Sequence, residues 1–299
     1  DEALASEGLH TLGAGIDPER PPQRVVSGPR YAAMEAYFDG DGPAGRTMMC
    51  STASIQVNVG LGDEPDRRWR LAHDLGPTLV ACFANSAVAE GRRTGWKSTR
   101  LANWWSIDRS RTAPVGGPSR EFVPYALDAR VMLVRRDPAT YVPLHRPLCF
   151  AAWIEDGHEL GFPSVDDLDY HLTTLFPPVR PRGWLELRYL DALPHPWWRV
   201  AATVAATLLT DLEAGDRAAR GAAGTEGLWL EAARVGLGHP GLARSAASGF
   251  AAALDALPHV GADASSSAAV AAFADRYVAR RRCPADDVSD ELVAQGASA

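Results

Sequence analysis

The segment Gly183–Asp191, GWLELRYLD, is the feature that most restricts the fold of this 299-residue chain. Its aromatic and branched side chains follow a glycine, which is typical of the start of a β-strand. Alternate residues of a strand point to opposite faces. Three apolar side chains then share one face, and Glu186 and Arg188 share the other. We therefore predict a sheet with one apolar face and one face that carries a carboxylate beside a guanidinium.

A second segment, ASIQVNVG at residues 53–60, repeats this alternation. Its polar face carries Ser54, Gln56 and Asn58, and its other face is aliphatic. Two interpretations stay open, because alternating strands are common in sheets that are wetted on one side. The polar face is either a solvated surface with an incidental ion pair, or the lining of a cleft.

The residue types on this face would suit phosphate and magnesium if the face lines a cleft. A carboxylate such as Glu186, held on a rigid strand, can join the octahedral coordination of Mg²⁺. An arginine two residues further on can donate two parallel hydrogen bonds to phosphate oxygens. Together they would offset the charge of a phosphoryl group during its transfer.

Residues 87–119 form a long stretch that we predict to be mainly irregular, with three tryptophans among several arginines. Loops of this length inside a domain are usually functional or disordered, and the aromatic content argues against disorder. Arg100 is suited to grip a carboxylate, and Trp104 to wall a pocket for an acidic substrate. The alternative is that the tryptophans only attach the loop to the core.

The rest of the chain predicts an α+β protein with one domain over residues 1–299. Residues 1–195 mix helices and strands, including a long strand over 46–62, and residues 196–299 read as Ala-rich helices. The net charge of −7 argues against a protein that coats nucleic acid or an anionic membrane. Four widely spaced cysteines favour a reduced, cytoplasmic setting, and no run of about 20 apolar residues predicts a membrane span.

Three motifs carry a resemblance to a known family. They are MMCSTASIQVNVG at 48–60, FANSAVAEGRRTGWKSTRLANWWSIDRSRT at 83–112 and DDLDYHLTTLFPPVRPRGWLELRYLD at 166–191. In sequence and spacing they resemble the plant-type and actinobacterial glutamate–cysteine ligases, above all those that open ergothioneine biosynthesis. The resemblance runs from about residue 8 to the last helices, and the three motifs together are far more specific than any one of them.

The resemblance implies a glutamine-synthetase-like fold, in which an antiparallel sheet lines a funnel. It implies that ATP phosphorylates the γ-carboxylate of glutamate and that the amine of cysteine then displaces phosphate, with Mg²⁺ at the phosphates. The resemblance implies that Glu186 is a magnesium ligand, that Arg188 contacts phosphate and that Gln56 lies near the metal or the nucleotide. It also implies that Arg100 and Trp104 bind the glutamate carboxylate. Thr52 would contact substrate from the strand of Gln56.

One departure from the family pattern concerns its first strand, whose clustered glutamates hold the metals, and a following strand that contains PGG. Neither is found in this sequence, which also does not begin with Met, so we expect both to be encoded upstream. Three hypotheses remain: a glutamate–cysteine ligase, a carboxylate–amine ligase that uses another amine, and a non-catalytic module that binds nucleotide or glutamate.

Overall fold

The computed structural model describes residues 2–137 and 139–296. The strands are β1 Ser54–Gly60, β2 Val88–Ala89, β3 Arg92–Arg93, β4 Leu133–Asp137, β5 Thr140–Pro143, β6 Val179–Pro181 and β7 Trp184–Asp191. The helices before β6 are α1 Glu2–Ser6, α2 Pro29–Asp39, α3 Ala44–Ser51, α4 Pro65–Asp74, α5 Gly76–Phe83, α6 Thr99–Ser106, α7 Arg109–Thr112, α8 Phe122–Asp128, α9 Phe150–Asp156 and α10 Val165–Thr173. The helices after β7 are α11 Trp197–Thr210, α12 Leu212–Ala222, α13 Trp229–Val235, α14 Pro240–Ala256, α15 Ala264–Phe273, which continues as a π-helical turn over Ala274–Val278, and α16 Pro284–Gly296.

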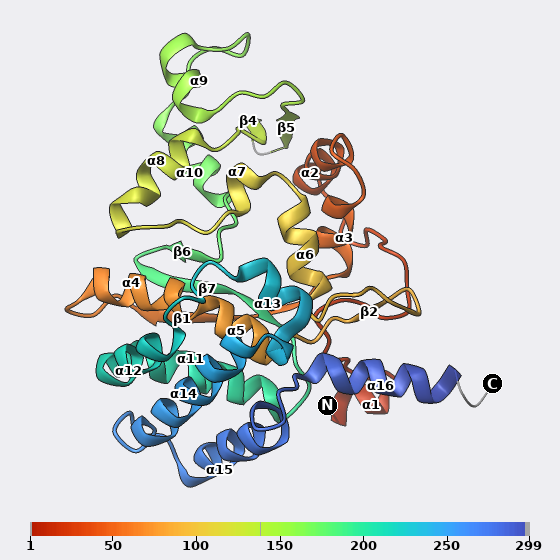
Figure 1. Cartoon of the computed structure of the whole chain (residues 1–299). Coiled ribbons are helices and arrows are strands. Elements are labelled where there is room, and N and C mark those ends of the chain that lie inside the picture. Colours follow the sequence, from red (N-terminus) through yellow and green to blue (C-terminus); the bar gives the residue numbers. More distant parts are fainter. Residues whose placement is uncertain (1, 138, 297–299) are drawn as a thin grey trace.

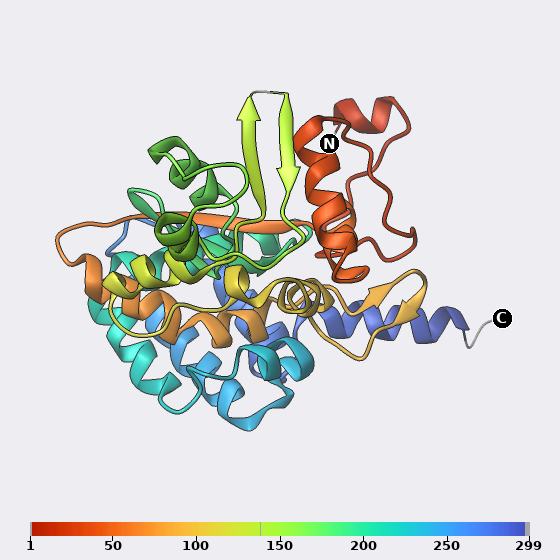
Figure 2. The ribbon, with the colours of Figure 1, turned by 90° about the horizontal axis from the view of Figure 1, so that it is seen from above.

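The central sheet has the order β1-β7-β6, with both neighbours antiparallel to β7. Figure 1 shows this sheet between two layers, with the helices α11, α12, α14 and α15 on one side and α8 to α10 with the β4–β5 hairpin on the other. Figure 2 shows that hairpin standing upright beside α2, against which β5 packs. The predicted α+β class is confirmed.

The main core lies under the apolar face of the sheet. Leu185, Leu187 and Tyr189 of β7 are at most 1% exposed and belong to one cluster with the buried faces of α5 and α11. Their burial provides the main stabilisation of the sheet, because a fully buried aliphatic or aromatic side chain contributes roughly 1.5–3 kcal/mol. The predicted apolar face is therefore confirmed. None of the helices in the described ranges combines the length and apolar content needed to cross a bilayer.

The long strand that we predicted over residues 46–62 is wrong in its first half. Residues Ala44–Ser51 are helical, and β1 begins only at Ser54. Met48 on the buried side of α3 packs into a second cluster with Tyr37 and Phe38. The short apolar run fits either a helix or a strand locally, and this packing decides for the helix.

The stretch 87–119 is also more regular than we predicted. It holds the β2–β3 hairpin and the helices α6 and α7. Each helix begins at a capping side chain, because Ser98 accepts a hydrogen bond from the N–H of Leu101 and Asp108 accepts one from the N–H of Ser110. These two caps are the local signals that the irregular appearance of the segment concealed.

Candidate active site

The polar face of the sheet brings residues from all three strands into register. Asn58 of β1 and Arg180 of β6 both lie opposite Glu186 of β7. A β-bulge interrupts the β1–β7 pairing at Gln56, which is exposed, as is Asn58. The predicted clustering of polar side chains on one face is confirmed, and Gln56 lies on the same strand as Asn58.

Glu186 is the anionic centre of this face and is only 7% exposed. The Nε and Nη2 atoms of Arg180 lie 2.9 and 2.8 Å from its Oε2 atom, and Nη1 of Arg188 lies 2.6 Å from its Oε1 atom. Both carboxylate oxygens therefore accept hydrogen bonds from arginines. Charge-assisted contacts of this kind are the strong ones, and they hold the two guanidinium groups in place.

Arg180 is a residue of this site that our sequence analysis missed. It belongs to the three-residue strand β6, which a tight turn joins to β7. The turn was signalled by Gly183, whose φ of 79° suits a glycine. Antiparallel pairing across that turn sets Arg180 directly opposite Glu186, so a hairpin interpretation of VRPRGWLEL would have found it.

Arg188 is held in an environment that disfavours its charge. Burial lowers the pKa of its guanidinium to about 10, and the nearby Arg180 acts in the same direction, while Glu186 opposes both. The guanidinium lies over the rings of Trp104 and Phe176, at 5.6 and 5.9 Å from their centroids. Its Nε atom is buried without a hydrogen-bond partner, which is costly unless a ligand supplies an acceptor.

Arg100 and Trp104 lie one helical turn apart on α6, so they share a face of that helix. Arg100 is 3% exposed, and its Nη2 atom donates to the backbone carbonyl of Arg188 at 2.5 Å. Its Nη1 atom lies 3.5 Å from Oδ1 of Asp191, at the end of β7. Burial lowers the pKa of Arg100, and the charge of Asp191 opposes that shift. The structure thus brings Arg100, Trp104 and Arg188 together around one small cavity, which Phe176 also lines.

The resemblance predicted that Thr52 lies on the same strand as Gln56. This prediction is wrong. Thr52 caps the C-terminal end of α3, two residues before β1, and it pairs with Ile16 in an isolated β-bridge. Its hydroxyl donates to the carbonyl of Met48 at 2.7 Å, a common bond for a threonine at a helix end. Its proposed role as a substrate contact is not tested by this placement.

The fit of the described residues to a metal ion is incomplete. Within residues 2–137 and 139–296, no group of three or more His, Cys, Asp or Glu side chains is arranged to hold a metal. Glu186 would have to release at least one arginine to coordinate an ion. Mg²⁺ is commonly bound by one or two carboxylates together with substrate phosphates, so Glu186 alone does not make a resident site. The assignment of Glu186 and Gln56 as metal ligands stays a prediction.

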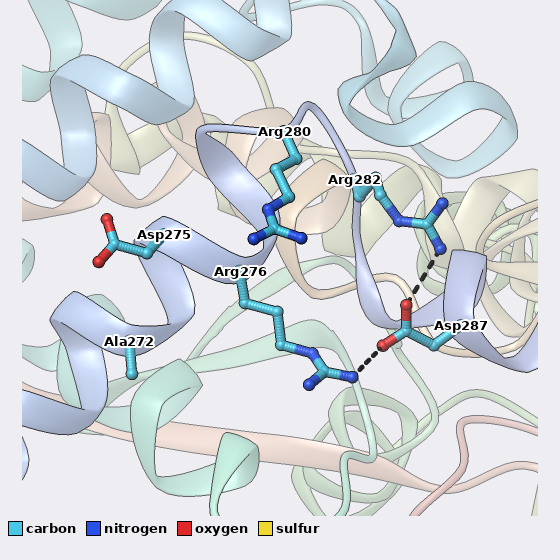
Figure 3. A pocket seen from close by; sticks show the side chains of 6 residues that line it. All are labelled: Ala272, Asp275, Arg276, Arg280, Arg282 and Asp287. Carbon is cyan, nitrogen blue, oxygen red and sulfur yellow. Dashed lines mark hydrogen bonds and ion pairs between the residues drawn. The ribbon is translucent and has the colours of Figure 1, made fainter.

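A second hollow lies far along the chain, between the π-helical turn and α16 (Figure 3). Arg276 and Arg282 point into it, and both donate to the carboxylate of Asp287, at 2.7 and 3.0 Å. These contacts belong to a partly solvent-exposed network of ion pairs. We place the candidate active site on the polar face of the sheet, where Arg188 keeps a buried, unpartnered nitrogen beside two further arginines, Arg100 and Arg180.

Comparisons with known proteins identify relatives over nearly the whole chain. Residues 1–298 match glutamate–cysteine ligase family 2. The chain is 44% identical to the glutamate–cysteine ligase EgtA of Mycolicibacterium smegmatis, over 99% of this chain and 71% of that protein. It is 41% identical to EgtA of Mycobacterium tuberculosis, over 98% of this chain and 69% of that protein.

Plant proteins are more distant. The chloroplastic glutamate–cysteine ligase of Arabidopsis thaliana is 32% identical over 67% of this chain and 40% of that protein. The match of the whole chain, together with the identity to the mycobacterial proteins over nearly its full length, confirms the resemblance drawn from the three motifs. This chain belongs to glutamate–cysteine ligase family 2.

Proposed function

We propose that this chain carries the ATP-dependent joining of the γ-carboxylate of glutamate to the amine of cysteine. Family membership supports this proposal, and so does the charge of the polar face. Arg100, Arg180 and Arg188 carry three positive charges against the two negative charges of Glu186 and Asp191, so one positive charge is left for an anionic ligand. The observation that carries the proposal is the buried, unpartnered Nε of Arg188 on this face.

The proposed reaction has two displacements. An oxygen of the glutamate γ-carboxylate attacks the terminal phosphorus of ATP, and ADP leaves with the electron pair of the broken P–O bond. The neutral amine of cysteine then attacks the acyl carbon of γ-glutamyl phosphate, the C–O bond breaks, and phosphate leaves. The amine loses a proton as the amide of γ-glutamylcysteine forms.

The side chains of the site take distinct parts in this scheme. Arg188, with Arg180 beside it, donates hydrogen bonds to phosphoryl oxygens, where negative charge grows during transfer. Arg100 and Trp104 hold the glutamate carboxylate and exclude water from it. Gln56, exposed where the register between β1 and β7 shifts, contacts the nucleotide, and Thr52 contacts substrate just before β1.

A metal ion completes the proposal, because ATP-dependent ligases of this kind generally use one. Bound Mg²⁺ would neutralise charge on the phosphate oxygens, with Glu186 as the protein ligand and Gln56 close by. The funnel-shaped, glutamine-synthetase-like arrangement of the sheet, a cytoplasmic location and use of the product in ergothioneine biosynthesis are further parts of this proposal.

The test is glutamate-dependent release of phosphate from ATP, followed with cysteine and with a panel of other amines. We expect cysteine to give the highest kcat/KM and γ-glutamylcysteine to form in step with phosphate. A higher kcat/KM with another amine would support the alternative in which this carboxylate–amine ligase uses a different acceptor.

A second candidate function is binding without turnover. It is favoured by one observation, namely that both oxygens of Glu186 already accept hydrogen bonds from arginines. Calorimetry with ATP–Mg²⁺ and with glutamate separates the two functions. Binding of both ligands, with no phosphate released when cysteine is added, would establish the binding module and exclude the ligase.

A further inference from the structure

Asp191 ends the central strand β7 and is 1% exposed. Such a buried carboxylate needs several hydrogen-bond donors. Its Oδ2 atom accepts from the backbone N–H of Asn85 at 2.9 Å and from the hydroxyl of Ser86 at 2.7 Å. Its Oδ1 atom accepts from the hydroxyl of Ser98 at 2.9 Å and faces Nη1 of Arg100 at 3.5 Å. One side chain therefore receives four donors.

These donors come from two segments that Asp191 joins to the end of β7. Asn85 and Ser86 follow α5, and Ser98 is the N-terminal cap of α6. Ser86 also accepts a hydrogen bond from the backbone N–H of Arg100 at 3.1 Å. The first turn of α6, which carries Arg100, is thus attached to Asp191 both directly and through Ser86.

A third segment leaves room for this carboxylate. A Cβ atom at Gly15 would lie 2.6 Å from Cγ of Asp191, closer than real Cβ contacts allow. Gly15 also donates its N–H to the carbonyl of Asn85 at 2.9 Å. Gly15 therefore has a packing reason beside Asp191, and a Cβ atom at Gly13 would collide with the backbone of Pro194.

Arg100 keeps donors free after these contacts. Of the five N–H bonds of a guanidinium, one points to Asp191 and one to the carbonyl of Arg188. The three others have no acceptor among the described residues, and Arg100 lines the cavity beside Trp104. Asp191 holds one end of the guanidinium, which leaves the other N–H groups for an incoming carboxylate.

We propose that Asp191 is a positioning residue for glutamate binding, which acts by holding the guanidinium of Arg100 and the first turn of α6 in place. This inference rests on the proposed function, in which Arg100 contacts the substrate carboxylate. A fixed guanidinium loses less conformational entropy when it binds, and a displacement of about 1 Å in such a group can cost as much as a hundredfold.

The experiment is a double-mutant cycle with Asp191→Asn, Arg100→Lys and the double variant, read as KM for glutamate and KM for ATP. We expect Asp191→Asn to raise the glutamate KM about tenfold and to leave the ATP KM within about twofold. In the Arg100→Lys background the same change should have little further effect, because the group that Asp191 positions is already lost.

Two further variants keep the test decisive. Asp108→Asn is the matched control, because Asp108 is also a buried helix cap paired with an arginine, Arg111, but it lies outside the cavity. It should lower the thermal midpoint without a selective change in glutamate KM. If Asp191→Asn does not fold, Ser86→Ala removes one donor to Asp191 and should raise the glutamate KM about threefold.

Several outcomes would overturn the inference. Equal changes in both KM values, or full additivity with Arg100→Lys, would make Asp191 a purely structural residue. An unchanged glutamate KM in a folded Asp191→Asn protein would do the same. If the parent protein releases no phosphate with glutamate, the proposed function itself fails, and this result is distinct from all of the above.

Discussion

Two largely buried arginines in this molecule, Arg111 and Arg188, differ in whether all of their N–H donors already have acceptors. The closed cluster is centred on Arg111, with Asp108, Tyr37 and Thr174 around it. Arg111 is fully buried, and acceptors surround all of its nitrogens: Asp108 at Nε, Thr174 at Nη1, and Tyr37 and the carbonyl of Arg130 at Nη2. No hydrogen-bonding capacity is left for a ligand.

The open cluster consists of Arg100, Arg180 and Arg188 with Glu186 and Asp191. Arg188 donates from one nitrogen to Glu186, while its Nε is buried without a partner. Native structures rarely leave buried donors unsatisfied, and the exceptions call for an explanation. Burial and charge alone therefore do not mark a binding site. Arg111 itself has acceptors at every nitrogen, whereas Arg188 keeps a free donor at Nε, so the two guanidinium groups differ in whether they can still bind an anion.

Arg111→Ala should have the largest effect, and that effect should be on stability. It leaves Asp108 buried without its partner, and breaking a buried pair in this way costs about 3–5 kcal/mol. Denaturant unfolding measures the loss. Activity per folded molecule should stay near that of the parent, and a stable but inactive variant would place Arg111 in the site.

Glu186→Gln should lower turnover per folded molecule about a hundredfold, and it should also lower the thermal midpoint, because two largely buried arginines lose the anion that pairs with them. The amide keeps the size of the side chain but removes its negative charge. That charge holds Arg180 and Arg188 in place and would help to coordinate a metal ion. Phosphate release at saturating substrates and Mg²⁺ measures the effect. Turnover within about threefold of the parent would remove Glu186 from the catalytic machinery.

Low pH should decrease the free energy of unfolding, partly through a histidine beside the closed cluster. His171 lies beside it, with Nε2 2.9 Å from the carbonyl oxygen of Ala126, and burial lowers the pKa of the imidazole to about 4 from an ordinary 6.5. His73 is buried with a pKa of about 4 for the same reason. Between pH 6.5 and pH 4 the unfolded chain binds more protons, so stability falls as the pH falls through this window.

Each histidine should cost about 2 kcal/mol between pH 7 and pH 5. Denaturant unfolding at several pH values measures the slope. His171→Gln should lower stability at pH 7 but remove roughly half of the pH dependence. An unchanged slope in that variant would mean that His171 stays neutral in both states.

Arg100→Lys should have the smallest effect and should be selective. Lysine keeps the charge but cannot form the planar pair of hydrogen bonds. We expect the glutamate KM to rise about tenfold, which is about 1.4 kcal/mol, and the ATP KM to change little. Steady-state kinetics with each substrate varied in turn decide the point, and equal changes in both values would assign Arg100 to the fold or to the nucleotide.

Prediction of the site from sequence succeeded where the relevant pattern is local. The period of two in GWLELRYLD places Leu185 inward and Glu186 on the polar face whatever surrounds the strand, since the pleat alone sets this alternation. The prediction failed where the local sequence is compatible with either a helix or a strand. We read the residues before β1 as strand, but they form α3, whose Met48 is buried in a cluster with Tyr37 and Phe38.

The sequence by itself determined the two faces of the sheet, the α+β class and, through three motifs, the family. Each of these follows from residues that lie close together in the chain. Tertiary structure alone decided that Arg180 opposes Glu186, that Thr52 caps a helix, and that Asp191 gathers donors from the segments at Asn85 and Ser98. These contacts join residues brought together by folding, and a buried charge is stable only where such donors converge on it.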